Sequence, residues 1–171
     1  GYYTFNHGKT DYNFVWDVNA TYSDQKATKD RWAKLKENQP FFGQIQTKGG
    51  KIGTKGLPKE KHTDRSKVTV PADYPDNEIY REVVAQHCDA IRTDDAVIGG
   101  ILEELRASGM MENTIVVYFG DHGANHLVRH KQMPTEGGLH VPFVLMGPEA
   151  HVPKQGVRND LVDMLDLSAT T

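Results

Sequence analysis

An apolar run that ends in a polar turn places the strongest constraint on the fold of this chain. Residues 114–119 are Thr-Ile-Val-Val-Tyr-Phe, a β-branched and aromatic composition that predicts a buried strand, and residues 120–123 are Gly-Asp-His-Gly. In open α/β sheets, ligands bind beyond the carboxyl ends of the strands. Asp121 and His122 are therefore candidates for binding a metal ion or an anion. A polar turn that follows a core strand would show the same residues.

The longest periodic segment lies just before this strand. Apolar residues recur at helical spacing from residue 77 to residue 108 and predict one long helix, with Asp76 as its N-cap and Gly109 as its C-cap glycine. Asp94 and Asp95 interrupt the apolar stripe. Because an unpaired buried carboxylate is costly, we expect one of these two side chains to reach a buried hydrogen-bond partner.

Strands and helices alternate along the chain. We expect strands at residues 1–6, 40–46, 114–119 and 139–146, and helices at residues 24–37, 77–108 and 157–167. This order, with a long crossover, predicts an α/β fold, a layered sandwich with a largely parallel mixed sheet flanked by helices. Residues 47–73 form the longest irregular region and are rich in glycine and lysine, but they lack the Gly-x-x-x-x-Gly-Lys-Ser/Thr pattern of a phosphate-binding loop.

The overall composition is that of a globular domain and excludes several functions. The 171 residues are 37% hydrophobic and 25% charged, and a net charge of -3 gives no basic footprint for nucleic acid. No apolar run approaches the roughly 20 residues that cross a bilayer, and no signal peptide is visible. A single cysteine, Cys88, excludes an intrachain disulfide. The chain starts without methionine and stops within a helical pattern, so we expect an internal fragment.

Histidine spacing offers a second possible metal site. His122, His126 and His130 are four residues apart and would share one face of a helix, as in zinc metalloprotease motifs. Gly123 stands where such motifs carry a glutamate, and the strand end argues against a helix. The pair of Asp121 with His122 at the strand tip is therefore favoured, and these ligands suit calcium, manganese or zinc.

The motifs occur in an order that resembles the sulfatase family of the alkaline phosphatase superfamily. The matching segments are Gly-Lys at residues 8–9, Pro-Phe-Phe at 40–42, the strand and Gly-Asp-His-Gly at 113–123, Arg-His-Lys-Gln at 129–132, Glu-Gly-Gly-Leu-His-Val-Pro at 136–142, Gly-Pro at 147–148, and Arg-Asn-Asp-Leu-Val-Asp-Met-Leu-Asp at 158–166. The resemblance covers nearly the whole chain, and this makes it more specific than any single motif.

The resemblance implies metal-dependent hydrolysis of a sulfate ester or sulfamate, expected on a carbohydrate, in an alkaline-phosphatase-like fold. The family uses a formylglycine nucleophile beside a divalent metal ion, usually calcium. Asp121 and His122 match its metal ligands, Lys9 its sulfate-contacting lysine, and Lys131 its second active-site lysine. A metal ion and two ammonium groups would stabilise the charge that develops on the sulfuryl oxygens and the leaving group.

The departures from the family pattern are equally specific. The nucleophile motif, Cys or Ser-x-Pro-x-Arg, and the family's N-terminal Asp-Asp metal pair are absent, so the chain is expected to be a partial catalytic domain spanning residues 1–171. Asp11 stands where the family often has one histidine, and a second histidine is replaced around Lys51. Lys51 and Asp11 are therefore candidate substrate-binding residues, with Lys48 as an alternative to Lys51. His7 or His62 is a candidate proton donor.

Two other functions remain open at this stage. A phosphatase, phosphodiesterase or phosphonate hydrolase of the same superfamily would share these motifs, and a binding homologue without catalysis would explain the missing histidines. Family analogy predicts a small-molecule or glycan sulfate as partner and a secreted, periplasmic or lysosomal location. The sequence leaves the oligomeric state open.

Overall fold

The computed structural model describes residues 1–51, 59–153 and 156–170 and has an α/β architecture. Strand β1 (Tyr3–His7) pairs in parallel with β2 (Phe41–Ile45), and β3 (Val116–Phe119) pairs antiparallel with β4 (Phe143–Met146). The α/β class is confirmed. Within the described residues the hydrogen-bonded ladders form two sheets of two strands each, one parallel and one antiparallel.

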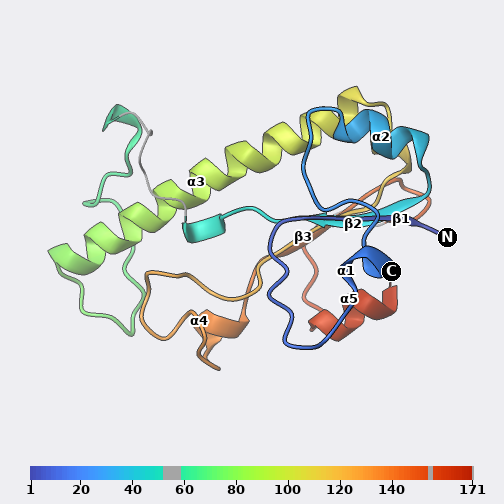
Figure 1. Ribbon diagram of the computed structural model, residues 1–171. Coiled ribbons are helices and arrows are strands. Elements are labelled where there is room, and N and C mark those ends of the chain that lie inside the picture. The colour runs from blue at the N-terminus through green and yellow to red at the C-terminus, as the bar shows by residue number, and fades with distance from the viewer. Residues whose placement is uncertain (52–58, 154–155, 171) are drawn as a thin grey trace.

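One helix dominates the molecule. Helix α3 (Glu78–Ala107) has 30 residues and, at 1.5 Å per residue, is about 45 Å long. Figure 1 shows its C-terminal part beside the strands and its N-terminal part projecting away from them. The other helical segments are short: α1 (Val18–Thr21), α2 (Arg31–Glu37), α4 (Glu136–Leu139), α5 (Met164–Thr170) and the 3₁₀ turns η1 (Gly49–Lys51), η2 (Lys59–Lys61) and η3 (Met111–Asn113). Among the described helices, none has the length and apolar content to cross a membrane.

The ends of α3 follow from local chemistry. Asn77, not Asp76, is the N-cap, because its side-chain oxygen accepts the Tyr80 N–H at 3.1 Å. The Asp76 carboxylate instead pairs with the Arg81 guanidinium at 2.6 Å. Gly109 follows the helix with φ 78°, a left-handed conformation that glycine adopts without strain, so the predicted C-terminal glycine is confirmed.

A small core joins the strands to the C-terminal part of α3. Phe5 on β1, Leu35 on α2, Leu105 on α3 and Met110 are buried together. Val116 on β3 packs against the same cluster. The two strands whose ends carry Lys9 and Asp121 are therefore held by one shared core.

Several sequence-based expectations for individual elements are corrected. The helix expected over residues 24–37 is reduced to Arg31–Glu37, because the Asp24 backbone pairs with β1 through Thr4 and Asn6. The strand expected at 139–146 starts at Phe143, and the helix expected at 157–167 is Met164–Thr170.

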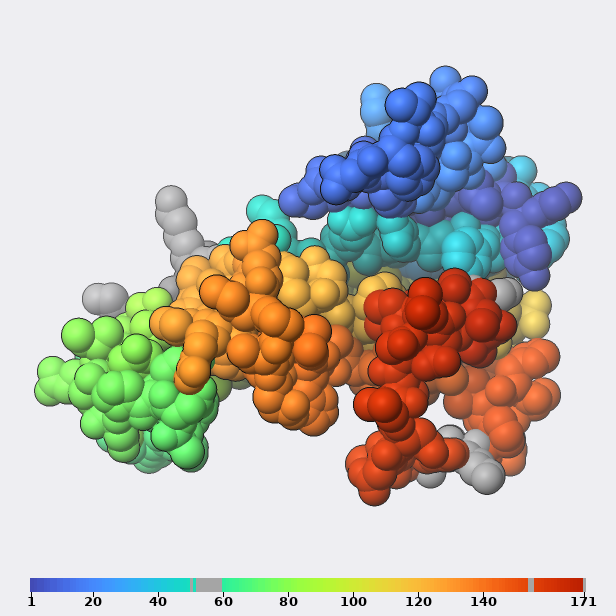
Figure 2. Space-filling model, turned by 90° about the horizontal axis from the view of Figure 1, so that it is seen from below, coloured from blue at the N-terminus to red at the C-terminus, as the bar shows by residue number. Residues whose placement is uncertain are grey.

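Strands β3 and β4 are also less buried than their composition predicts. Val144 is 51% exposed and Leu145 is 43% exposed, and Phe119 at the end of β3 is 39% exposed. The β-branched and aromatic content indicates strands suited to burial on both faces, but the described residues leave these side chains partly uncovered. Figure 2 shows the C-terminal segment, in red, set apart from the segment around residues 120–140, in orange.

Candidate functional site

Lys9 lies just beyond the end of β1 and is held by its backbone. The side-chain amide of Gln46 accepts the Lys9 N–H at 2.9 Å and donates to the Lys9 carbonyl at 3.0 Å, and Asn6 Nδ2 donates to the same carbonyl at 3.0 Å. The Lys9 ammonium forms an ion pair with Asp11 at 2.9 Å, and both side chains are largely exposed. Asp11 therefore screens the charge of Lys9 in this structure. The expected contact between Asp11 and a substrate stays a prediction.

Asp121 and His122 follow β3 at the position that the sequence predicts. The turn is packed so closely that a Cβ on Gly123 would lie 1.7 Å from the Gly137 carbonyl oxygen, which explains the glycine at this position. The Gly123 N–H also donates to the Gly138 carbonyl at 3.1 Å. The segment after β3 is thereby held against the start of α4.

The hydrogen bond of His122 determines which nitrogen faces Asp121. His122 Nδ1 lies 2.9 Å from the Gly123 carbonyl oxygen, which only accepts hydrogen bonds, so Nδ1 carries a proton. In the neutral imidazole, Nε2 is then an acceptor, and it lies 3.5 Å from the Asp121 carboxylate oxygen Oδ2. Two acceptor atoms that face each other favour a cation between them.

The residues of this pair fit two ligands of a metal ion. With metal–ligand bonds of about 2.0–2.6 Å, neighbouring ligand atoms on one ion stand about 3–3.5 Å apart, as Nε2 and Oδ2 do here. The backbone carbonyl that orients the imidazole is the kind of partner that supports a metal-bound histidine. Among the described residues, no group of three or more His, Cys, Asp and Glu side chains is placed to hold a metal ion.

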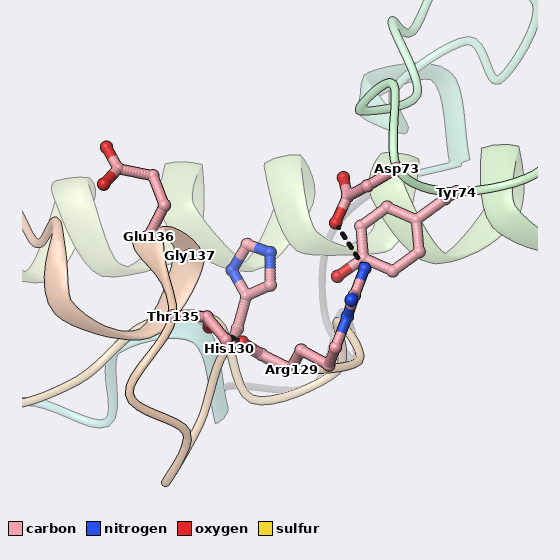
Figure 3. Close-up of a pocket in the computed structure, with 7 residues that line it drawn as sticks. All are labelled: Asp73, Tyr74, Arg129, His130, Thr135, Glu136 and Gly137. Carbon is pink, nitrogen blue, oxygen red and sulfur yellow. Dashed lines mark hydrogen bonds and ion pairs between the residues drawn. The ribbon is translucent and has the colours of Figure 1, made fainter.

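Lys131 lies in a loop whose backbone is strained on both sides of it. Arg129 has φ 61° and Gln132 has φ 62°, left-handed conformations that are uncommon for residues with a side chain. The loop is fixed by an ion pair between Arg129 and Asp73 at 3.0 Å and by a hydrogen bond from the Thr135 hydroxyl to the Arg129 carbonyl. Figure 3 shows Arg129 reaching to Asp73. Both residues line a cavity of about 150 Å³ beside this loop.

Three lysines and Asp121 converge from four separate segments. Lys51 is the largest cause of a lowered pKa at Lys131; desolvation and Lys9 act in the same direction, while Asp121 acts to raise this pKa. The Asp11 carboxylate is the main cause of a raised pKa at Lys9, and Asp121 adds to it. The structure thus brings Lys9, Lys51, Lys131 and Asp121 into one electrostatic neighbourhood.

The two candidate proton donors have different surroundings. His7 is only 7% exposed, and neither ring nitrogen has a hydrogen-bond partner among the described residues. Burial lowers its pKa; the nearby Asp24 carboxylate acts to raise it, and the charges of Arg31 and Lys34 act to lower it. His62 uses Nδ1 to pair with Asp89 of α3 at 2.8 Å.

The alternative zinc site on a helix is not formed. Residues 122–130 are bends and turns in this structure, so His122, His126 and His130 do not share a helical face. His126 and His130 are close enough to His87 to lower its pKa further, after the larger effect of its burial. No local sequence pattern predicts that Gln46 binds the Lys9 backbone, or that Arg129 and Gln132 adopt left-handed conformations.

A family model described as Sulfatase matches residues 2–171. The chain belongs to the sulfatase family. The ulvan-active sulfatase of Formosa agariphila is 25% identical over 185 residues, which cover 86% of this chain and 30% of that protein. The extracellular sulfatase SULF-1 homolog of Drosophila melanogaster is 28% identical over 108 residues, 61% of this chain and 10% of that protein.

Other relatives match a shorter part of this sulfatase chain. Arylsulfatase K of Canis lupus familiaris is 33% identical over 79 residues, 44% of this chain and 14% of that protein. Among solved structures, the lipoteichoic acid synthase LtaP of Listeria monocytogenes is similar over 86% of this chain and 43% of its own, with 18% identity and a TM-score of 0.48. The chain spans less than a third of the length of the curated relatives named here.

Proposed function

We propose that this sulfatase chain supplies the sulfate-binding lysines and part of the metal site of a sulfuric ester hydrolase. Two findings support the proposal: the family membership, and above all the convergence of Lys9, Lys51 and Lys131 near Asp121. The substrate we propose is a sulfate ester or sulfamate, expected on a carbohydrate. The alternatives are phosphoryl transfer and a binding protein without catalysis, and the replacement of two family histidines is the observation that fits the latter.

The lysines fit the charge of such a substrate. Lys51 and Lys131 present two ammonium groups to each other, and an anion between them would relieve their repulsion. Lys9 and Lys131 would donate hydrogen bonds to the sulfuryl oxygens and stabilise the negative charge that grows as the ester bond breaks. Lys51, at a position where the family carries a histidine, would bind an acidic group of the substrate.

Asp121 and His122 would hold a divalent cation. We propose calcium, by family analogy, with manganese and zinc as alternatives that the two ligand types also permit. A bound cation would polarise a sulfate oxygen as a Lewis acid. The contribution of this chain is to orient the ligands, through the Gly123 carbonyl on His122 and the close packing of Gly123 on Gly137.

The proposed nucleophile is a formylglycine outside these residues. The 171 residues contain no Cys or Ser-x-Pro-x-Arg motif, and Cys88 lies partly buried within α3. We further propose a location outside the cytoplasm, since one relative is named an extracellular sulfatase. The 171 residues alone should therefore bind sulfate without hydrolysing an aryl sulfate; hydrolysis by this chain would contradict the proposed origin of the nucleophile.

Isothermal titration with sodium sulfate, with and without calcium, tests the proposal. The variant with both Lys9→Gln and Lys131→Gln should bind sulfate about tenfold more weakly than the native protein, because it lacks both ammonium groups that would contact the anion. Lys29→Gln, at an exposed lysine before α2, is the control and should bind as the native protein does.

Two results would count against the proposal. Equal loss of affinity in the control would mean that sulfate binding depends on the overall charge of the protein and not on a specific site. Tighter binding of inorganic phosphate than of sulfate would favour the phosphoryl-transfer alternative.

A further inference from the structure

The segment that follows β2 contacts the backbone of Lys9 through one side chain. Gln46 makes two hydrogen bonds to Lys9, one as acceptor and one as donor, and its own N–H donates to the His7 carbonyl at 3.1 Å. The side chain lies flat over Gly8, where an added Cβ would come within 2.6 Å of Gln46 Cβ. Gly8 therefore leaves the space that lets Gln46 reach Lys9.

The same segment is tied to α3 through a buried carboxylate. Asp94 is 3% exposed and accepts the Thr47 hydroxyl at 2.9 Å and the Gly49 N–H at 3.1 Å. Gly49 starts the η1 turn, which ends at Lys51. The buried carboxylate that the sequence predicts within α3 is thus the anchor of the turn that presents Lys51.

A second aspartate on α3 makes comparable bonds to a different segment. Asp89 is 2% exposed and accepts the Thr63 hydroxyl at 2.6 Å and the Thr63 N–H at 2.8 Å, together with His62 and Arg92. It fastens the residues around Thr63, which carry none of the three converging lysines. Asp89 therefore provides a comparison for Asp94: it is a buried carboxylate that holds a loop against α3 without positioning a lysine of the site.

We propose that residues 46–51 form a bracket that sets the spacing of the lysines, with Gln46 as the positioning residue for Lys9 and Asp94 as the positioning residue for Lys51. The bracket spans from the end of β1 to α3, so that two of the three lysines are placed by one short segment. This inference rests on the proposed anion site. It adds that the affinity of the site depends on two side chains that do not contact the anion.

The bracket has a measurable electrostatic consequence. Lys51 lies beside Lys131 and lowers its pKa; Asp121 and Lys9 are the other charged groups that act on Lys131. Loosening the η1 turn lets the Lys51 ammonium move away from Lys131. The pKa of Lys131 then rises, and an anion between the two ammonium groups is bound less tightly.

Two matched substitutions test whether the Asp94 hydrogen bonds position Lys51 or only hold a loop against α3. Thr47→Val removes the hydroxyl bond to Asp94 and keeps the shape of the side chain, and Thr63→Val does the same at Asp89. ¹⁵N NMR of the lysine side chains reports the pKa of Lys131, and isothermal titration with sodium sulfate reports the affinity. We expect Thr47→Val to raise the pKa of Lys131 and to weaken sulfate binding at least threefold, while Thr63→Val changes neither.

Gln46 is tested by a double-mutant cycle. Gln46→Met removes both bonds to Lys9, and Gln44→Met, two residues earlier on β2, is its control. Gln46→Met should weaken sulfate binding at least threefold in the native background and have no further effect when Lys9→Gln is present. Gln44→Met should have no effect in either background.

The outcomes distinguish this inference from the proposed function. If the native protein does not bind sulfate, the proposed anion site fails, and the pKa of Lys131 in Thr47→Val still tests the bracket. The bracket is overturned if Thr47→Val and Thr63→Val shift the pKa of Lys131 equally or not at all. It is also overturned if the effects of Gln46→Met and Lys9→Gln are additive.

Discussion

Replacing the buried Asp89 by asparagine should change how the stability of the protein depends on pH. Burial of the carboxylate by itself would raise its pKa, but hydrogen bonds from Thr63, His62 and Arg92 outweigh burial and hold the pKa at about 2, against an ordinary value of 3.8. Because 1.36 kcal/mol corresponds to one pH unit, this gap stabilises the folded protein by about 2 kcal/mol. Asp89 is 2% exposed, so solvent screening is small.

The sign of the effect fixes the pH window. A carboxyl group whose pKa is depressed by folding contributes its full stabilisation above its unfolded pKa and loses it as the pH falls from about 4 to about 2. Asp89→Asn cannot titrate. The difference in unfolding free energy between the native protein and Asp89→Asn should therefore be largest at pH 6 and shrink by about 2 kcal/mol at pH 2.

Urea unfolding followed by circular dichroism at pH 6, 4, 3 and 2 measures this difference. Asp95→Asn, at an exposed position of the same helix, is the control and should stay within about 0.5 kcal/mol of the native protein throughout. A difference between native protein and Asp89→Asn that stays constant over this range would refute the assignment of a depressed pKa to the hydrogen-bonded Asp89.

Three further substitutions test other parts of the structure. Gly123→Ala should destabilise the protein by about 2 kcal/mol or more in urea unfolding, because the added Cβ would meet the Gly137 carbonyl. Gly100→Ala, in open space on α3, is the control and should stabilise the protein by up to about 1 kcal/mol. Similar effects at both positions would contradict the close packing of Gly123. Burial lowers the pKa of His7, so the unfolded state binds its proton more readily and the thermal midpoint should fall as the pH drops below 6.5. His7→Phe should make this fall less steep. An unchanged dependence of the thermal midpoint on pH would exclude His7 as the cause of the fall. Asp121→Asn should weaken calcium binding at least tenfold by isothermal titration, while the exposed Asp166→Asn should not, and equal effects would place the metal elsewhere.

Local patterns in the sequence predict the parts of the site that are close in the chain. The strand that carries Asp121 and His122 is evident from its β-branched run, and the hydrogen bond of His122 is to the next residue, Gly123. The inward-pointing carboxylate on α3 follows from the cost of burying an unpaired charge, and Asp94 has that role. The positions of the strand and of the buried carboxylate follow from the pattern of neighbouring residues, although the partners of Asp94 lie far away in the chain.

The contacts between distant segments could not be predicted. Thr47 and Gly49 bind Asp94, yet they belong to a lysine- and glycine-rich region without periodicity. Lys51 meets Lys131 only because η1 and the strained loop are each fixed by other residues. Part of the expected irregular region, residues 52–58, lies outside the described residues.

Competition between neighbouring groups explains the smaller errors. Asp76 and Asn77 are both good helix caps, and the choice depends on Arg81, which pairs with Asp76 and leaves Asn77 as the cap. The charged run after residue 24 favours a helix, but the Asp24 backbone forms a bridge with Phe5 of β1. A local ion pair in the first case and a tertiary contact in the second decide between alternatives of similar free energy.

Lys9, Lys51 and Lys131 are proposed to form one anion site. A ¹⁵N NMR titration of the lysine side chains with sodium sulfate, at constant ionic strength and saturating calcium, tests this proposal. We expect these three ammonium signals to shift together with one dissociation constant, while the exposed Lys29 does not respond. Separate dissociation constants for the three lysines, or an equal response of Lys29, would contradict a shared site.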